Sequence, residues 1–187
     1  GLTNLSQNNG LCSYIRGTEY YGYLLKVMTD SQMGADELYQ YLDEARKRVK
    51  QEMDNTGLVD TGELPEKSVE EIVDGLYART KENFPDIGEV TWKIETIPAG
   101  MNSSLYQAFF MKEQTKGGNY IYVSNDIRTD DYLELYETLA HETMPGHMYC
   151  YNYQTDALYP LLERQYGWLG YNEGWAFYAE FLAAEWL

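Results

Sequence analysis

The two histidines of the chain are close together, in the segment HETMPGH that begins at His141 and ends at His147. Glu142 follows the first histidine directly. Imidazole nitrogens and carboxylate oxygens are favoured ligands of zinc. The segment differs from the zinc-binding pattern H-E-x-x-H because Pro145 and Gly146 precede the second histidine. A metal site here requires a backbone that brings the two imidazoles together.

A regular helix cannot do this. Each helical residue turns by about 100°, so residues six positions apart point roughly 120° away from each other. Pro145 lacks the N–H that would bond to the carbonyl of His141, and its ring clashes with that carbonyl. Gly146 can adopt backbone angles that are closed to other residues. We therefore predict a break at this pair that returns His147 to the side of His141.

A catalytic zinc ion needs a third protein ligand and an open position for water. The best candidate is Glu173, at the start of the last predicted helix. Glu180 lies on nearly the same face of that helix and could orient one of the histidines. Glu142 is placed beside the metal, where it could take a proton from the attacking water.

Each of these residues also has a simpler interpretation. Two histidines at a helix end could merely complement the helix dipole, and Glu173 could do so in a first turn. Glu142 and Glu180 could be solvated surface carboxylates. Cys150 could contact a metal but is better interpreted as a buried free thiol, because a soft fourth ligand would close the position that water needs. The combination of H-E, Pro-Gly and a downstream glutamate favours the metal site.

The surrounding sequence predicts a helical part over residues 17–85. Apolar residues recur at helical spacing over 17–30 and 34–57. A further helix begins after a capping box formed by Ser68 and Glu71.

Residues 86–125 instead show alternating apolar positions. The runs EVTWKIETIP, SLYQAFFM and GNYIYVSN predict about three strands, the last two as a hairpin. Helical spacing returns over 126–187, the part that carries the metal-site residues. The aromatic residues of the last helix are expected in the core: Trp175, Phe177, Tyr178, Phe181 and Trp186. We predict one α+β domain over residues 1–187, mostly helical, with a small sheet and a pair of metal-site helices, as a piece of a longer protein.

The charge of the chain excludes some functions. It has 30 acidic and 14 basic residues, for a formal net charge of −16. Nucleic-acid binding is not expected, because phosphates would be repelled. No apolar run is long enough to predict a transmembrane segment. The 19 tyrosines favour a secreted or cell-envelope protein, and the oligomeric state is left open.

Two motifs carry a resemblance when taken together. HETMPGH fits H-E-x-x-P-G-H, and EGWAFYAE follows it from Glu173 onward. The pair resembles the bacterial family catalogued as domain of unknown function 885. The segments GTEYYGYLLKVMT and GNYIYVSN resemble the family's preceding blocks, so the similarity extends from about Gly17. That family is related to the zincin-type metallopeptidases, which hold a metal between an H-E-bearing helix and a downstream glutamate helix.

The resemblance implies a zincin-like fold in which His141, His147 and Glu173 bind Zn²⁺ and Glu142 is the general base and acid. Met148 departs from the family, whose members often have a histidine at that position. The implied function is a zinc-dependent hydrolase, first of all a peptidase acting on a peptide or small amide. One alternative is a catalytically incomplete or non-catalytic domain that binds peptides or is structural. Another is a metal hydrolase of esters or non-peptide amides.

In zincins the substrate commonly joins the exposed edge of the sheet beside the metal. We expect GNYIYVSN or SLYQAFFM to be that edge. Tyr171 and Tyr178 are the tyrosines nearest in sequence to Glu173. A tyrosine near the metal could stabilise an oxyanion, but the sequence does not single out one of them.

Overall fold

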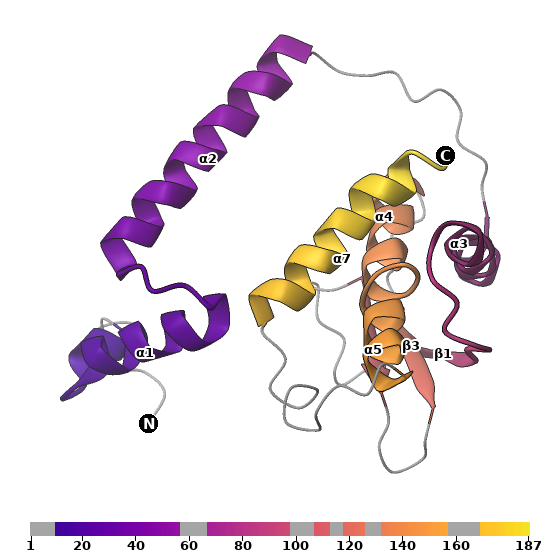
Figure 1. The fold of residues 1–187 in the computed structure, drawn as a ribbon, viewed down its shortest axis with the longest axis horizontal. Helices are drawn as coiled ribbons and strands as arrows, with labels where there is room; N and C mark the ends of the chain where they lie inside the picture. Colours follow the sequence, from indigo (N-terminus) through magenta and orange to yellow (C-terminus); the bar gives the residue numbers. More distant parts are fainter. Residues whose placement is uncertain (1–9, 57–66, 98–106, 113–117, 126–131, 157–168) are drawn as a thin grey trace. The chain divides into compact units, whose positions relative to one another are not determined.

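The computed structural model describes residues 10–56, 67–97, 107–112, 118–125, 132–156 and 169–187 (Figure 1). The chain divides into two compact units. The first comprises residues 1–61 with 168–170, and the second comprises 62–167 with 171–187.

The described residues of the first unit form a short 3-10 helix, η2 (Gly10–Ser13), and two α-helices, α1 (Gly17–Thr29) and α2 (Ala35–Thr56). Asp30 follows α1 in the left-handed conformation, as expected for a helix that ends there. Helix α2 covers the predicted amphipathic segment, whose expected stop at Gly57 lies outside the described residues. Its apolar side chains Leu42 and Val49 are each 55% exposed.

The second unit combines four helices with a small sheet in the residues described. The helices are α3 (Val69–Asn83), α4 (Tyr132–Glu142), α5 (His147–Asp156) and α7 (Leu169–Ala184), of which α7 begins in the first unit. The strands are β1 (Trp92–Thr96), β2 (Ala108–Lys112) and β3 (Asn119–Val123). The predicted α+β class is confirmed.

Helix α3 begins at the predicted capping box. The Ser68 hydroxyl accepts a hydrogen bond from the Glu71 N–H at 3.2 Å. The Glu71 carboxylate accepts one from the Ser68 N–H at 2.8 Å. Two backbone donors that the helix leaves without partners are thereby satisfied.

The strand order in the sheet is β1-β3-β2. Strands β2 and β3 pair antiparallel, as predicted for a hairpin, and β1 pairs parallel to β3. Because β3 is central, the prediction that GNYIYVSN could be a free edge is wrong. β2, from the other candidate segment, is an edge strand.

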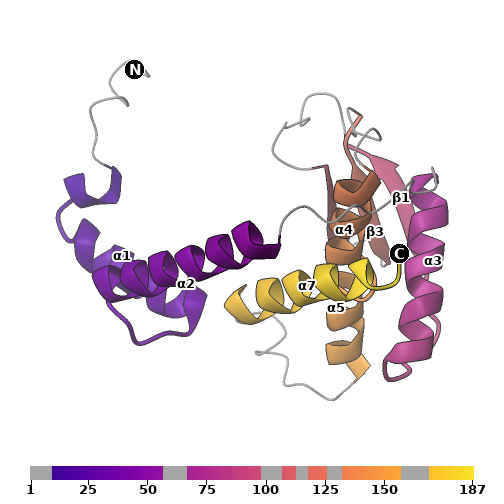
Figure 2. The same ribbon diagram turned by 90° about the horizontal axis from the view of Figure 1, so that it is seen from above.

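Helix α4 packs against α3 and against the sheet (Figures 1 and 2). The core between them is formed by fully buried apolar side chains: Ile72, Leu76, Ile121, Leu135 and Leu139. None of the helices in the described part of the chain is long and apolar enough to span a membrane.

The inner face of α7 differs from the prediction. Its buried residues are Ala176, Ala179 and Ala183, whereas Phe177 and Phe181 are more than half exposed. Small side chains allow a helix to approach its neighbours closely. The prediction that Phe177 and Phe181 lie in the core is therefore wrong. Both helix faces are apolar, so the spacing of apolar residues did not show that the alanine face is the buried one.

Truncating the centre of this core should destabilise the second unit. Leu139 is fully buried between α3 and the sheet, so Leu139→Ala removes about 2–5 kcal/mol from the free energy of unfolding. Urea unfolding followed by tryptophan fluorescence measures this. Phe181→Ala, at a side chain that is 62% exposed, is the control and should change it by less than about 1 kcal/mol. Equal effects of the two variants would contradict this description of the core.

Candidate metal centre

The HETMPGH segment forms a helix–turn–helix rather than one bent helix. Helix α4 ends at Glu142, and α5 begins at His147. The Met144–Pro145 peptide bond between them is cis. The Gly146 N–H donates to the Ala140 carbonyl at 3.0 Å, which satisfies one of the acceptors at the end of α4.

Gly146 is required for a different reason than the one predicted. Its φ angle is not in the left-handed region. A Cβ atom at this position would instead lie 1.9 Å from the His141 carbonyl oxygen and 2.4 Å from that of Ala140. Both neighbours are backbone atoms of α4, which cannot move aside as a side chain could. The turn therefore depends on the small size of glycine, which allows it to approach the end of α4.

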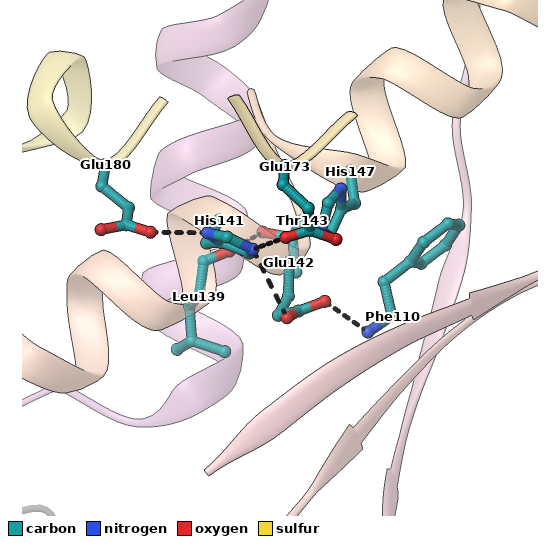
Figure 3. A network of polar contacts seen from close by, with 8 residues as sticks. All are labelled: Phe110, Leu139, His141, Glu142, Thr143, His147, Glu173 and Glu180. Carbon is teal, nitrogen blue, oxygen red and sulfur yellow. Dashed lines mark hydrogen bonds and ion pairs between the residues drawn. The ribbon is translucent and has the colours of Figure 1, made fainter. Parts of the chain in front are cut away.

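The turn brings the two histidines together (Figure 3). The ring centroids of His141 and His147 are 4.6 Å apart, and the ring planes are nearly perpendicular. Each side chain is only 20% exposed. The donor atoms of His141, Glu142 and His147 lie within 4.8 Å of one another.

Glu173 of α7 faces both imidazoles. Its Oε2 atom is 3.5 Å from His141 Nε2, and its Oε1 atom is 3.7 Å from His147 Nε2. Two ligand atoms bound tetrahedrally to one zinc ion at about 2.1 Å are themselves about 3.4 Å apart. Both distances from Glu173 to the imidazoles are close to this value, although the Glu173 side chain is 52% exposed. Glu142 Oε1 is more distant, at 4.0 Å from His141 Nε2.

Glu180 fixes the orientation of His141. Its Oε1 atom lies 2.5 Å from His141 Nδ1. A carboxylate only accepts, so Nδ1 donates to Glu180 and Nε2 is the ring nitrogen that faces Glu173. Glu173 and Glu180 are seven residues apart on α7, and Figure 3 shows both on this helix, beside His141.

Trp175 attaches α7 to the turn. Its indole N–H donates to the Pro145 carbonyl at 2.8 Å. Its ring also packs against the core of the second unit. Sequence reasoning placed Trp175 among core aromatics and missed this polar contact. Its position two residues after the candidate ligand Glu173 was the only feature of the sequence that could have suggested this contact.

Strand β2 contacts the candidate metal centre through the edge that is not paired with β3. Ser124 N–H donates to the Gln107 carbonyl at 2.8 Å across the hairpin. Hydrogen-bonded pairs alternate along an antiparallel ladder, so the backbone groups of Ala108, Phe110 and Lys112 face away from β3. Phe110 N–H donates to Glu142 Oε2 at 2.8 Å (Figure 3). A backbone donor of this kind leaves no trace in the sequence.

The surroundings shift the pKa values of two site residues. Burial raises the pKa of Glu142, although the Phe110 N–H and His141 act against this rise. Burial, together with the charge of His141, lowers the pKa of His147, while Glu173 acts in the opposite direction. A neutral imidazole is the form that binds a metal. A carboxylate with a raised pKa is closer to the range of a general base at neutral pH.

Comparison with known proteins gives the family. Residues 60–186 match the family described as "Bacterial protein of unknown function (DUF885)". The chain belongs to this family. None of the curated proteins matches this DUF885 chain.

The fold of this DUF885 chain is similar to a crystal structure described as that of the putative lipoprotein from Colwellia psychrerythraea. The TM-score is 0.73 at 20% sequence identity. The similarity covers 96% of this chain and 36% of that chain, so the chain spans about a third of the length of the protein it matches.

Four further residues of the DUF885 chain were considered as possible parts of the metal centre. Met148 is fully buried in the hydrophobic core. Cys150 is a buried free thiol. Tyr171 and Tyr178 are each more than half exposed.

The close approach of Gly146 gives a testable result. Gly146→Ala should destabilise the turn by about 1–3 kcal/mol or more, because the added methyl group meets two carbonyl oxygens of α4. Gly75→Ala is the matched control: a Cβ atom on Gly75 in α3 has nothing within 4 Å, and alanine favours the helix. Urea unfolding measures both changes. Destabilisation of similar size in the two variants would contradict the steric argument.

Proposed function

We propose that this chain carries the metal centre of a zinc-dependent hydrolase of zincin-like fold that cleaves peptide bonds. The proposal rests on one observation. The Nε2 atoms of His141 and His147 face the two oxygens of one carboxylate, that of Glu173, at 3.5 and 3.7 Å. Two imidazoles and one carboxylate match the ligand set of catalytic zinc sites, which leaves a fourth position for water.

The charge of the cluster supports a cation. Glu142, Glu173 and Glu180 bring three carboxylates to two histidines. We find no lysine or arginine paired with these carboxylates in the described ranges. Like charges held together are costly unless a cation offsets them. A divalent ion would do so, and Glu180 would keep His141 in the tautomer that binds it.

The residues of the chain have separate roles in this reaction. When bound, zinc would polarise the scissile carbonyl and acidify a water molecule. Glu142 would accept the proton of the attacking water and pass it to the leaving amine, which suits a carboxylate whose pKa is raised by burial. The Phe110 N–H holds one oxygen of Glu142, so the other oxygen is left on the side of His141.

The free edge of β2 would hold the substrate. Ala108 and Lys112 direct their backbone groups away from β3, on either side of the Phe110 N–H that contacts Glu142. An extended peptide could add to this edge as a further strand. Its backbone would then pass directly beside Glu142. This arrangement favours a peptide over a compact ester or amide.

A cell-envelope location is part of the proposal. The protein from Colwellia psychrerythraea, which has a similar fold, is described as a putative lipoprotein.

Zinc binding tests the ligand set. Calorimetric titration should show one zinc ion per chain in the unaltered protein. His141→Ala and Glu173→Ala should each weaken binding by more than about 100-fold, the upper end of the effect of partners that only orient a ligand. Absence of stoichiometric zinc would exclude the hydrolase and favour a non-catalytic peptide-binding or structural domain.

The same titration has an internal comparison on α7. Glu180→Gln should weaken zinc binding by about 10-fold, because a neutral amide replaces the carboxylate that orients His141 and increases its basicity as a ligand. Glu185→Gln changes an exposed carboxylate near the end of the same helix and should have no effect. If both variants bound zinc more weakly, the cause would be a general charge effect rather than a defined site.

Glu142→Gln tests the reaction itself. Glutamine keeps the size of the side chain and an oxygen for the Phe110 N–H, but it cannot accept the proton. Hydrolysis of a peptide library should fall by about 10²–10⁴-fold, while zinc still binds. Full activity of this variant would exclude Glu142 as the base.

A further inference from the structure

Lys112 is the last residue of β2 and has an unusual set of contacts. Its ammonium nitrogen donates to Asn119 Oδ1 at 3.1 Å and lies 5.6 Å from the centroid of the Tyr151 ring. Asn119 is itself buried and held by neighbours: it donates to the Thr91 carbonyl and accepts from Asn152. The position of the ammonium is therefore defined by a network of neutral groups.

This network adjoins the metal centre. Phe110 and Lys112 are two residues apart on one strand, so both side chains are on the same face of the sheet, about 7 Å apart along it. The Phe110 ring also contacts the Tyr151 ring, with the centroids 6.1 Å apart. Tyr151 is one helical turn after His147 on α5, about 6 Å further along the helix axis. Lys112 thus stands at one end of the edge that passes Glu142.

The ammonium has no anionic partner among the residues that the structure describes. Burial lowers the pKa of Lys112, so its surroundings disfavour the charged form. A lysine has three N–H donors, and Asn119 accepts from only one of them. Within the described ranges, its other donors have no hydrogen-bond acceptor.

We propose that Lys112 binds a carboxylate of the substrate, so that the site selects peptides with an anionic group within a few residues of the cleaved bond. This inference rests on the proposed function and names its substrate class. The carboxylate can belong to an acidic side chain or to a free C-terminus, both of which present the same acceptor to the ammonium. A hydrogen bond between two charged groups is roughly twice as strong as one between neutral groups.

Peptide binding to the zinc-loaded Glu142→Gln protein tests this without cleavage. The probes are a neutral alanine-rich heptapeptide with blocked ends and three versions of it. One carries glutamate before its central residue, one carries glutamate after it, and one has a free C-terminal carboxylate. At least one anionic version should bind about 10-fold or more tighter than the neutral peptide. The version that does so identifies the source of the carboxylate.

Substitution of the lysine should remove the preference for anionic peptides. Lys112→Met should reduce the ratio of anionic to neutral peptide affinity to less than about 2-fold, whereas Lys112→Arg should retain part of it. Lys93→Met is the matched control, because Lys93 also lies over a tyrosine of β3, Tyr120, but from the opposite strand β1. A preference that persists in Lys112→Met, or no preference in the parent protein, overturns the proposal.

The two proposals can fail separately. Equal kcat/KM values of the zinc enzyme for neutral and anionic peptides would overturn the role of Lys112 and leave the hydrolase intact. The protein could instead bind no zinc and cleave no peptide, yet bind anionic peptides more tightly than neutral ones through Lys112. This result would exclude the hydrolase and leave the anion site intact.

Discussion

Two imidazoles that come from one short segment can face the same point only if the helix between them is interrupted. In this chain the interruption consists of four residues, and its tightest point is the contact of Gly146 with the carbonyl oxygens of Ala140 and His141. The remaining parts of the centre are arranged around this contact. Trp175 binds the carbonyl of Pro145 within the turn, which places α7 and its two glutamates beside the histidines.

Helix α4 carries residues of both the hydrophobic core of the second unit and the candidate metal centre. Leu135 and Leu139 are buried against α3 and the sheet, while His141 and Glu142 are at the end of the same helix. The carboxylate of Glu142 is partly removed from water, which is costly unless it has hydrogen-bond donors. The N–H of Phe110 supplies one, from a strand whose position is set by its pairing with β3. Packing of the sheet and orientation of Glu142 are therefore coupled.

Much of this arrangement could be predicted from local patterns. The capping box, the hairpin and the proximity of His141 to His147 follow from residue types at short spacings, which local physical chemistry determines. Other features could not be predicted, because they depend on distant backbone atoms. The donor to Glu142 is a backbone N–H, and the role of Gly146 depends on carbonyls of the preceding helix rather than on its own dihedral angles. The exposed aromatic face of α7 was missed because alanine and aromatic residues alternate on an apolar helix.

The free edge of β2 also bears on how such a protein avoids self-association. Open strand edges are templates for strands of other molecules and can start aggregation. β2 has only five residues, its middle N–H is occupied by Glu142, and a charged lysine stands at its end. Few backbone groups are then left for a long, continuous ladder with another copy. These features of the edge disfavour the unlimited strand addition from which fibrils grow.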